Sequence, residues 1–337
     1  MPSSFDEFEL IERYFAPLSS GEAGAFALTD DAAELAVTPG KHAVVTTDAI
    51  VAGVHFPASE TPAFIASRLV RVNLSDLAAM GATPRAYTLA MALPDTTTTD
   101  WVAAFAQGLE KEQRTFGITL LGGDTTRSRG ELMLCLTMIG EVDDKAIILR
   151  SGASVGDEVY VSGTIGDAML GLALIEDRVT LTDEAARDFL IDRFRHPIPR
   201  VEVGIGLAGI ASAAADISDG LVADLNHICR ASSVSAEVGL PLIPLSSAAR
   251  SLVTDDQPLH VNLLTGGDDY ELVFTAPANV SGRLQELAKQ CGVGLTRIGR
   301  IIDQGAQPST VSVQDTNGRT VEVGDGGYRH FRRGNPR

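Results

Sequence analysis

The sequence predicts an α/β (α+β) protein of two domains: an N-terminal mixed β-sheet with helices on one face, and a C-terminal α/β sandwich. The chain has 337 residues, which is more than one hydrophobic core ordinarily supports. Short β-branched runs alternate with longer helical patterns along most of it. A turn-rich stretch near Arg150 marks a change of character, so we expect domains at 1–148 and 149–337.

Composition and charge exclude several classes of protein. The net charge of −17 argues against nucleic acid or an anionic membrane surface as a partner, because both require basic patches. No apolar run reaches membrane-spanning length, and the acidic N-terminus lacks the basic region of a signal peptide, so the cytoplasm is the expected compartment. Three scattered cysteines without C-x-x-C spacing indicate neither a disulfide framework nor a zinc site.

The N-terminal domain is expected to be organised around one strand and the loop that follows it. The apolar run at 43–45 predicts a buried strand, and Thr46, Thr47 and Asp48 then place two hydroxyls and a carboxylate at its end. A carboxylate at the end of a buried strand is unfavourable unless a cationic group meets it. His55, in the loop, is equally consistent with a structural histidine and with a substrate contact.

A long helix is predicted from about Ala63 to Met80. Ile65, Leu69 and Val72 form an apolar stripe along it, and the next position of that stripe is Asp76. A carboxylate in register with a buried stripe breaks a local rule, which favours a functional role. The structural alternative is a cap, or a pairing with one of the two arginines of the same helix.

The remaining elements follow from the same periodicities and from the Gly and Pro residues between them. In the N-terminal domain we expect a short helix at 5–14, strands at 85–93, 118–121 and 132–142, and a helix at 101–116. In the C-terminal domain we expect strands at 158–162, 214–217, 272–275, 295–302 and 311–314, with helices from 168, at 183–195, at 200–211, up to 231 and at 280–290.

Carboxylates recur in turns and at the ends of the predicted elements. They are Asp30, Asp31, Asp48, Asp76, Asp124, Asp216, Asp219, Asp268 and Asp269. Each alone is more often a solvated turn or a helix cap, and Ser218 or Asp219 as an N-cap is the structural alternative for that segment. Several such positions on separate elements predict one site for several Mg²⁺ ions that hold phosphates, because carboxylate oxygens suit Mg²⁺.

Familiar nucleotide-binding motifs are missing or lie in the wrong context. Residues 204–209 match G-x-G-x-x-G, but they lie inside a helical run and follow no strand. Small residues that pack a helix are therefore the better interpretation of this segment. The sequence also lacks a Walker A loop, a nucleophile elbow and an H-E-x-x-H motif.

Taken in order, the motifs resemble those of the thiamine-monophosphate kinase family, in the superfamily of aminoimidazole ribonucleotide synthetase and selenophosphate synthetase. The matching segments span nearly the whole chain: DDAA at 30–33, TTD at 46–48, GVHF at 53–56, VNLSDLAAMGA at 72–82, GGDTT at 122–126, RSGA at 150–153, DISDGL at 216–221, GDDYEL at 267–272 and GYRHF at 327–331. Thr29 departs from the glycine that the family usually has before the first pair of acids.

This resemblance implies ATP-dependent phosphorylation of thiamine monophosphate to thiamine diphosphate, the last step of thiamine diphosphate biosynthesis. It also implies a fold like that of aminoimidazole ribonucleotide synthetase and a homodimer formed through the N-terminal domain. The implied Mg²⁺ ligands are Asp31, Thr46, Thr47, Asp48, Asp76, Asp124, Asp216 and Asp219, of which Asp48, Asp76, Asp124 and Asp216 are the implied catalytic residues. The implied ATP contacts are Gly123, Asp124, Arg150 and Ser218, and the implied contacts to the thiamine phosphate are His55, Asp268 and Tyr328.

A mechanism follows as a hypothesis. The acceptor is a phosphate monoester, which is largely dianionic at neutral pH and needs no general base. The difficulty is repulsion: two unit charges about 4 Å apart repel by roughly 4 kcal/mol at an effective dielectric constant near 20. Cations that bridge both phosphates would remove it, so we expect direct in-line transfer without a phospho-enzyme. The alternatives are another ATP-dependent enzyme of the same superfamily, a metal-dependent phosphatase and a non-catalytic acidic binding module.

Overall fold

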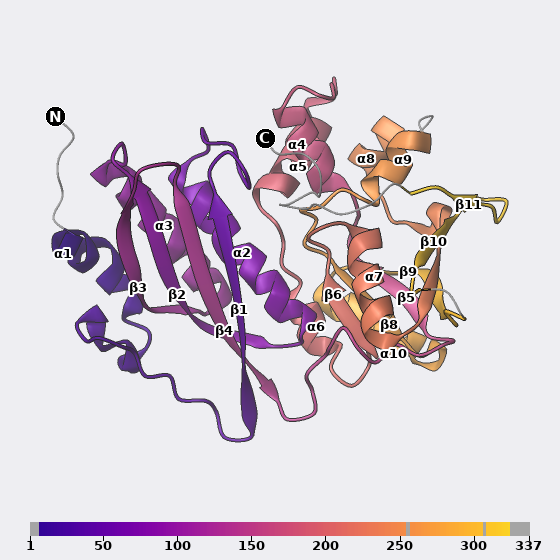
Figure 1. The fold of residues 1–337 in the computed structure, drawn as a ribbon, viewed down its shortest axis with the longest axis horizontal. Helices are drawn as coiled ribbons and strands as arrows, with labels where there is room; N and C mark the ends of the chain where they lie inside the picture. The colour runs from indigo at the N-terminus through magenta and orange to yellow at the C-terminus, as the bar shows by residue number, and fades with distance from the viewer. Residues whose placement is uncertain (1–6, 254–256, 306–307, 324–337) are drawn as a thin grey trace. The chain divides into compact units, whose positions relative to one another are not determined.

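The computed structural model describes residues 7–253, 257–305 and 308–323 (Figure 1). The described residues form two compact units. The N-terminal unit comprises residues up to 77 together with 82–147, and the C-terminal unit comprises 78–81 together with residues from 148 onward. Among the described residues, no helix is both long enough and apolar enough to span a bilayer. Each unit contains one β-sheet with helices, so the predicted α/β class is confirmed.

A four-stranded sheet of order β1-β4-β2-β3 forms the centre of the N-terminal unit. Its strands are β1 (Lys41–Val51), β2 (Thr83–Pro94), β3 (Thr119–Ser128) and β4 (Met133–Asp143). Strand β4 runs antiparallel to both β1 and β2, whereas β3 runs parallel to β2, so the sheet is mixed as predicted. Strands β1 and β3 are therefore the two edges of this sheet.

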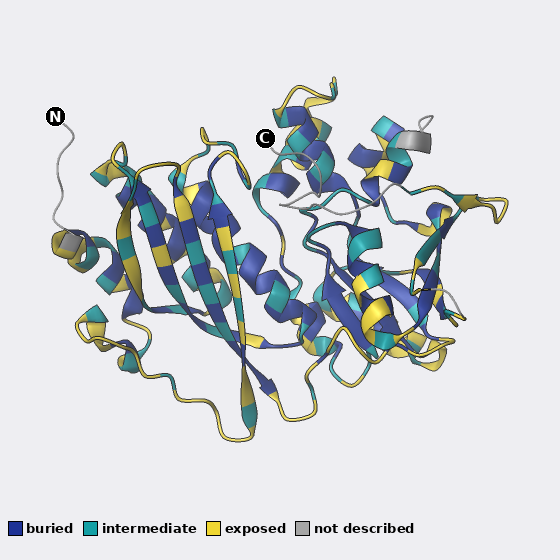
Figure 2. Cartoon of the chain, viewed as in Figure 1, coloured by how far each residue is buried: buried dark blue, intermediate teal, exposed yellow. Residues whose placement is uncertain are grey.

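Two long helices, α2 (Pro62–Ala79) and α3 (Thr99–Phe116), cover one face of the sheet (Figure 1). Leu136 of β4 points to this covered face and is fully buried. On the opposite face, Ala25 and Leu28 pack on Ala86 and Leu121, while the part near β1 and β4 is more open. Figure 2 shows buried and exposed residues alternating along the strands. On the open face Val45 of β1 is 60% exposed and Met133 of β4 is 42% exposed. The open face is thus partly apolar, which is unusual for a sheet face left to solvent.

Short helices precede the sheet, in place of the single helix expected at 5–14. They are α1 (Glu7–Leu10), the π-helix η1 (Ile11–Phe15), and the 3-10 helices η2 (Ala16–Ser19) and η3 (Ala23–Leu28). Three consecutive residues of η3 are left-handed, with φ of 49° at Phe26, 53° at Ala27 and 60° at Leu28. L-residues avoid this region because Cβ approaches the following carbonyl, at about 1–2 kcal/mol per residue. The chain thus enters the Asp30-Asp31 segment through a strained turn.

A seven-stranded sheet of order β11-β10-β7-β9-β5-β8-β6 forms the centre of the C-terminal unit. Its strands are β5 (Glu158–Ser162), β6 (Ala213–Asp216), β7 (Ser235–Gly239), β8 (Leu272–Ala276), β9 (Leu295–Ile302), β10 (Val311–Gln314) and β11 (Thr320–Val321). The helices of this unit are α4 (Asp167–Ile175), α5 (Glu184–Arg195), α6 (Val201–Gly206), α7 (Leu221–Ser232), α8 (Ser247–Val253), α9 (Gln257–Leu263) and α10 (Ser281–Cys291), with the 3-10 helices η4 (Leu240–Leu242) and η5 (Ala278–Val280).

Both faces of the C-terminal sheet are buried, each by a separate apolar cluster. Along β5, Val159 and Val161 belong to one cluster, while Tyr160 belongs to the other and stacks on Phe274. This alternation is what a strand with helices on both faces requires. The predicted sandwich is therefore confirmed.

Helix α6 begins at Val201 and ends at Gly206, five residues earlier than predicted. A Cβ atom on Gly204 would lie 1.9 Å from the carbonyl oxygen of Ala78, so only a bare backbone fits between these two segments. The interpretation of residues 204–209 as a packing motif is confirmed at this position.

Candidate active site

The first acidic group lies where β1 faces α2. Thr46 and Asp48 are two residues apart on β1, so both side chains point to the face that α2 covers. The hydroxyl of Thr46 donates to Asp76 Oδ2 at 2.5 Å. Burial, and then the negative charge of Asp76, raise the pKa of Asp48 to about 6. Of the two arginines considered as structural partners for Asp76, Arg71 is bonded to Glu112 at 2.9 Å.

The sequence predicted that Asp48 stands at the end of a strand, but in the structure it lies within strand β1. Strand β1 continues to Val51, and Asp48 pairs opposite Leu136 of β4. The prediction was wrong because cross-strand pairing carries the strand through residues of low β-propensity. One consequence concerns Thr47, which faces the open side of the sheet, where its Oγ1 lies 2.7 Å from Thr137 Oγ1.

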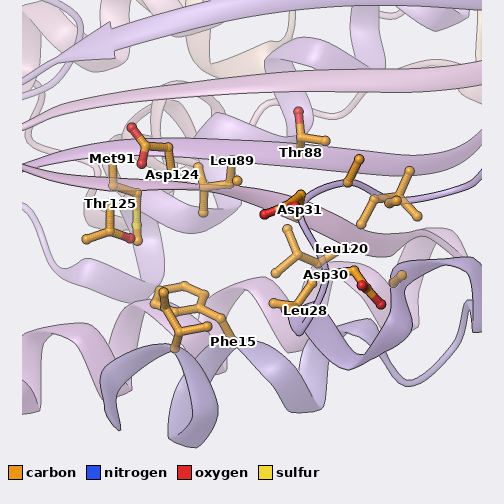
Figure 3. A pocket seen from close by; sticks show the side chains of 17 residues that line it. Phe15, Leu28, Asp30, Asp31, Thr88, Leu89, Met91, Leu120, Asp124 and Thr125 are labelled. Atoms are coloured by element: carbon orange, nitrogen blue, oxygen red, sulfur yellow. The ribbon is translucent and has the colours of Figure 1, made fainter. Parts of the chain in front are cut away.

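The second acidic group lines a cavity of about 340 Å³ beside β3 (Figure 3). Phe15 and Leu120 contribute apolar surface. Asp31 and Asp124 also line the cavity, and in Figure 3 the carboxylate of Asp124 lies on the far side of its strand from Phe15. Gly123 also lines the cavity. The structure thus brings three of the predicted site residues to one cavity of a size that suits small molecules.

Residues 122–124 form the middle of β3, although the sequence predicted that the strand ends at Leu121. A Cβ atom on Gly123 would lie 1.9 Å from the carbonyl oxygen of Leu89 on β2. Glycine is therefore required for the close approach of the two strands. Asp124 is exposed at this edge of the sheet.

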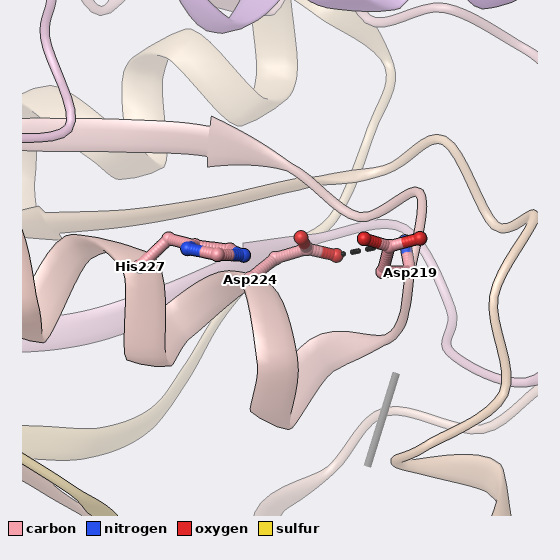
Figure 4. Close-up of side chains that lie close together, drawn as sticks. All are labelled: Asp219, Asp224 and His227. Carbon is pink, nitrogen blue, oxygen red and sulfur yellow. Dashed lines mark hydrogen bonds between the residues drawn. The ribbon is translucent and has the colours of Figure 1, made fainter. Parts of the chain in front are cut away.

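The third acidic group surrounds the start of α7 in the C-terminal unit (Figure 4). Asp216 is buried at the end of β6, as predicted. Asp219, Asp224 and His227 each direct one potential ligand atom to a common place, and these atoms all lie within 4.8 Å of one another. Asp219 was predicted as a ligand, whereas the other two residues were not.

Asp224 takes the place of the helix cap expected from the sequence. Its Oδ2 accepts hydrogen bonds from the backbone N–H groups of Ser218, Asp219 and Gly220 at 3.0–3.1 Å. Gly220 is the N-cap of α7, so Ser218 or Asp219 as an N-cap is wrong. Burial, and then the charge of Asp219, raise the pKa of Asp224 to about 7, and the backbone N–H groups oppose this rise. Because these N–H groups already donate to the Asp224 carboxylate, they are not available to bind a phosphate.

Arg150 belongs to the surroundings of this third group. Its positive charge opposes the rise of the Asp224 pKa, and, after burial, it is the next largest influence that lowers the pKa of His227. A predicted ATP contact and a predicted metal ligand, Asp219, are thus placed close together within the C-terminal unit.

Asp268, a predicted substrate contact, lies in a segment that pairs with the same turn. The backbone N–H of Asp268 donates to the carbonyl of Ser218 at 2.9 Å, and that of Tyr270 donates to the carbonyl of Ile217 at 2.8 Å. The structure therefore ties Asp268 to Ser218, a predicted ATP contact. Tyr328, the remaining predicted substrate contact, lies outside the described residues.

His55 is oriented by its own loop in the N-terminal unit. The backbone N–H of Val51 donates to Nδ1 of His55 at 3.0 Å. A ring nitrogen that accepts carries no proton, so the neutral ring bears its proton on Nε2. Nε2–H is therefore the donor that His55 would offer to a ligand.

The sequence and the fold both match known proteins. Residues 29–142 match the family model of AIR synthase related protein, N-terminal domain, and residues 154–311 match that of AIR synthase related protein, C-terminal domain. The thiamine-monophosphate kinase of Caulobacter vibrioides is 42% identical over 88% of this chain and 84% of its own. That of Stenotrophomonas maltophilia K279a is 41% identical in structure-based alignment, with a TM-score of 0.78 over 87% of this chain and 91% of the other. AaThiL complexed with AMPPCP and TMP is 30% identical, with a TM-score of 0.76 over 90% of this chain and 91% of the other.

The chain belongs to the thiamine-monophosphate kinase family. The resemblance that the motifs indicated is thereby confirmed, together with the fold that it implied. Structures of the hydrogenase maturation protein HypE, 20% identical with a TM-score of 0.76, share the fold alone.

In this member of the thiamine-monophosphate kinase family, sequence reasoning overlooked Asp224 and His227. A signal was available, because Asp224 stands four residues after Gly220, the distance at which a side chain on the first turn reaches back to the helix start. His227 follows three residues later and so lies on the same face of α7. Their proximity to Asp219 required the structure.

Proposed function

We propose that the protein transfers the γ-phosphoryl group of ATP to thiamine monophosphate, forming thiamine diphosphate, and that Mg²⁺ at its acidic groups is required. Membership of the thiamine-monophosphate kinase family supports this, as does the AMPPCP and TMP complex of AaThiL. The observation that carries the proposal is the pairing of Asp48 with Asp76. Two carboxylates are held together in a partly desolvated place, where the pKa of Asp48 rises to about 6 and where a cation would relieve their repulsion.

Mg²⁺ fits the donors of these groups, because every predicted ligand offers oxygen. The residues that would hold the ions are Asp31, Thr46, Thr47, Asp48, Asp76, Asp124, Asp216 and Asp219. When bound, Mg²⁺ supplies positive charge that offsets the repulsion between the two phosphate groups.

The remaining residues have positioning roles, since the acceptor phosphate is already a nucleophile. Residues 123–124 line the cavity that receives ATP in the N-terminal unit. Arg150 and Ser218 are the further ATP contacts that the family resemblance implies. The Nε2–H of His55 donates to the acceptor, and the carboxylate of Asp268 attracts the positively charged thiazolium ring of thiamine.

One chain does not bring the two acidic groups of its N-terminal unit together. Asp48 pairs opposite Leu136, Leu136 opposite Leu89, and Leu89 opposite Gly123. Neighbouring strands lie about 4.8 Å apart, so the strands of Asp48 and Asp124 are separated by about 14 Å. Carboxylates that share one Mg²⁺ lie much closer, because each oxygen is about 2.1 Å from the ion.

A second copy of the chain closes this gap. Strands β1 and β3 are long edges of 11 and 10 residues, and unpaired edges are where chains join. If β1 of each copy lies beside β3 of the other, the two sheets close into an eight-stranded barrel without free edges. The face with Val45 and Met133 becomes the barrel interior, and strand β1 of one copy, which carries Asp48, lies beside strand β3 of the second copy, which carries Asp124.

The reaction is tested by incubating the protein with ATP, Mg²⁺ and thiamine monophosphate and identifying the product by mass spectrometry. Thiamine diphosphate and ADP in equal amounts are expected. A metal-dependent phosphatase would instead release inorganic phosphate without ATP, and another enzyme of the superfamily would leave thiamine monophosphate unchanged. Absence of thiamine diphosphate would overturn the proposed function.

The shared site is tested by mixing two inactive variants, Asp48→Asn and Asp124→Asn, after unfolding and refolding them together. In a mixed dimer one site has lost both carboxylates and the other has kept both, so about a quarter of wild-type activity returns after random pairing. If each site uses both residues of one chain, every site lacks one carboxylate and no activity returns. Light scattering should give twice the chain mass of 35.5 kDa.

A further inference from the structure

We propose that the buried Asp269 is a positioning residue, which holds Asp268 in place against the Ser218 turn and so sets the acceptor side of the site relative to the nucleotide side. The inference rests on the proposed function in its choice of substrate. Its structural half concerns only contacts within the C-terminal unit, and these are tested separately below.

Asp269 acts as a remote cap for α4. The residue at the N-cap position of that helix is Gly166, which has φ of 87° and no side chain with which to cap it. Asp269 lies about a hundred residues later in the sequence. Its carboxylate accepts the N–H of Gly166 at 2.7 Å and the N–H of Ala168 at 3.3 Å. The carboxylate is almost completely buried, at 1% exposure. Its position is therefore fixed by the first turn of α4.

A second anchor lies two residues further along. Glu271 is fully buried and accepts hydrogen bonds from Arg193 at 2.9 Å, from Arg200 at 2.6 Å and from the hydroxyl of Ser162 at 2.6 Å. A buried carboxylate with this many charged and polar partners has little freedom to move. The segment is thus fixed on both sides of Tyr270.

Unusual backbone conformations lie on both sides of Asp269. Asp268 has φ of 73° and Tyr270 has φ of 51°, both in the left-handed region that residues other than glycine rarely occupy. Such conformations persist only where the surroundings determine them, and they concentrate at functional sites. Here Asp269 and Glu271 point inward, while Asp268 and Tyr270 remain partly exposed, and the hydroxyl of Tyr270 donates to Asp268 Oδ1 at 3.3 Å.

The segment is also held closely against the turn that precedes α7. A Cβ atom on Gly267 would lie 2.3 Å from the carbonyl oxygen of Ser218, and the N–H of Asp268 donates to that same carbonyl at 2.9 Å. The N–H of Ile217 donates to the carbonyl of Glu271 at 2.8 Å. A displacement of Asp268 away from the Ser218 turn therefore breaks its bond to that turn, and the strain favours this release once the anchor at Asp269 is weakened.

The variants Asp269→Asn and Asp269→Ala weaken this anchor to different degrees. The amide keeps the shape and one acceptor oxygen but turns an N–H₂ group toward a backbone donor, whereas alanine removes both acceptors. We expect KM for thiamine monophosphate to rise about tenfold in the amide variant and more in the alanine variant, while KM for ATP stays within about twofold. We also expect the amide protons of Asp268 and Tyr270 to exchange about ten times faster than in wild type.

Asp183→Asn is the matched control. Asp183 also caps a helix of this unit, accepting the N–H of Ala186 at 3.1 Å, but it is exposed and lies outside the Asp268 segment. Neither KM value nor the exchange of the Asp268 amide should change in this variant, because asparagine is an equally good cap.

Unchanged exchange at Asp268 and Tyr270 in both Asp269 variants would overturn the proposal. So would faster exchange with both KM values unchanged, or with both raised equally, because these results assign Asp269 to general stability alone. If wild-type protein forms no thiamine diphosphate, the proposed function fails, and the exchange measurement alone then decides whether Asp269 anchors the segment.

Discussion

Two buried acids, one in each unit, have opposite surroundings. In the N-terminal unit Asp48 lies beside Asp76, and both influences on the pKa of Asp48, burial and this neighbour, raise it. In the C-terminal unit Glu271 is more deeply buried, yet Arg193 and Arg200 surround it with donors at 2.5–2.9 Å. The negative charge of Asp48 is thus opposed by that of Asp76, whereas the negative charge of Glu271 is balanced by two arginines.

This difference shows that burial alone does not identify a ligand-binding acid. A buried carboxylate with charged partners or several backbone donors holds the fold in place. A carboxylate whose nearest charged neighbour is another carboxylate destabilises the fold unless a cation arrives. The first kind is a structural part of the site, and the second kind is where the chemistry is expected.

The largest expected effect is that of Asp48→Asn on catalysis. Removal of a charge that holds the cation should lower kcat about thousandfold, which a coupled ADP assay measures. At pH 7.5 and without cations the same variant should be more stable than wild type. The folded-state pKa of about 6 lies above the unfolded value near 3.9, so an ionised Asp48 destabilises the fold at this pH by about 3 kcal/mol. The melting temperature should therefore rise by a few degrees.

Asp143→Asn is the control for that prediction, since Asp143 lies in the same sheet but has a side chain that is 71% exposed. Neither turnover nor melting temperature should change appreciably in it. Wild-type turnover in Asp48→Asn at limiting Mg²⁺ would remove the basis for the comparison between the units.

Glu271→Gln should have the next largest effect, and on stability. The variant leaves the buried Arg193 and the largely buried Arg200 without their anion, so the free energy of unfolding should fall by about 3 kcal/mol. Urea unfolding followed by circular dichroism measures this loss. Glu237→Gln is the control, because Glu237 also accepts two hydrogen bonds from one arginine, the exposed Arg300, and its loss should change stability by less than about 1 kcal/mol. Equal losses of stability in the two variants would show that the buried carboxylate of Glu271 holds the fold no more strongly than the surface carboxylate of Glu237.

The affinity for Mg²⁺ should depend on pH in the range where Asp48 takes up a proton. Below about pH 6 the proton competes with the cation, so affinity should fall by up to about tenfold per pH unit, whereas above this range it should be nearly constant. Isothermal titration calorimetry from pH 5 to pH 8 measures this dependence. In Asp48→Asn the fall in Mg²⁺ affinity below about pH 6 should disappear. A wild-type affinity that does not change with pH in this range would show that Asp48 is not a ligand.

The smallest effect is expected from Ala27→Gly in the left-handed turn before the second acidic group. Glycine adopts φ of 53° without strain, so the free energy of unfolding should rise by about 1 kcal/mol. Ala49→Gly in the extended strand β1 should lower it instead, because glycine gains freedom only in the unfolded chain. If both variants are destabilised, the turn is not strained.

Much of the fold was predictable because its helices and central strands have strong periodicity. Strands β5 and β10 have the predicted bounds, and α3, α5 and α10 begin and end within two residues of them. Strand β7 (Ser235–Gly239) was missed, because its Ser, Ala, Glu and Gly residues have little β-propensity and pairing with neighbours decides its conformation. Strands β1 and β3 were predicted too short for the same reason.

The site was predictable in its residue types and much less in its geometry. Sequence order could indicate that Asp48 and Asp124 are both important. It could not indicate that their strands form opposite edges of one sheet, since strand order depends on long-range pairing. Asp224 and Asp269 were not assigned roles because each acts on backbone amides, which carry no signal in a sequence.

The sheet order of the C-terminal unit has a consequence for synthesis on the ribosome. Strand β5 is made first, but its two neighbours, β8 and β9, begin more than a hundred residues later, at Leu272 and Leu295. The N-terminus of helix α4 likewise has no cap until Asp269 has been synthesised. The early part of this unit therefore emerges with unpaired strand edges and an uncapped helix, and it is the stretch that chaperones should protect during translation.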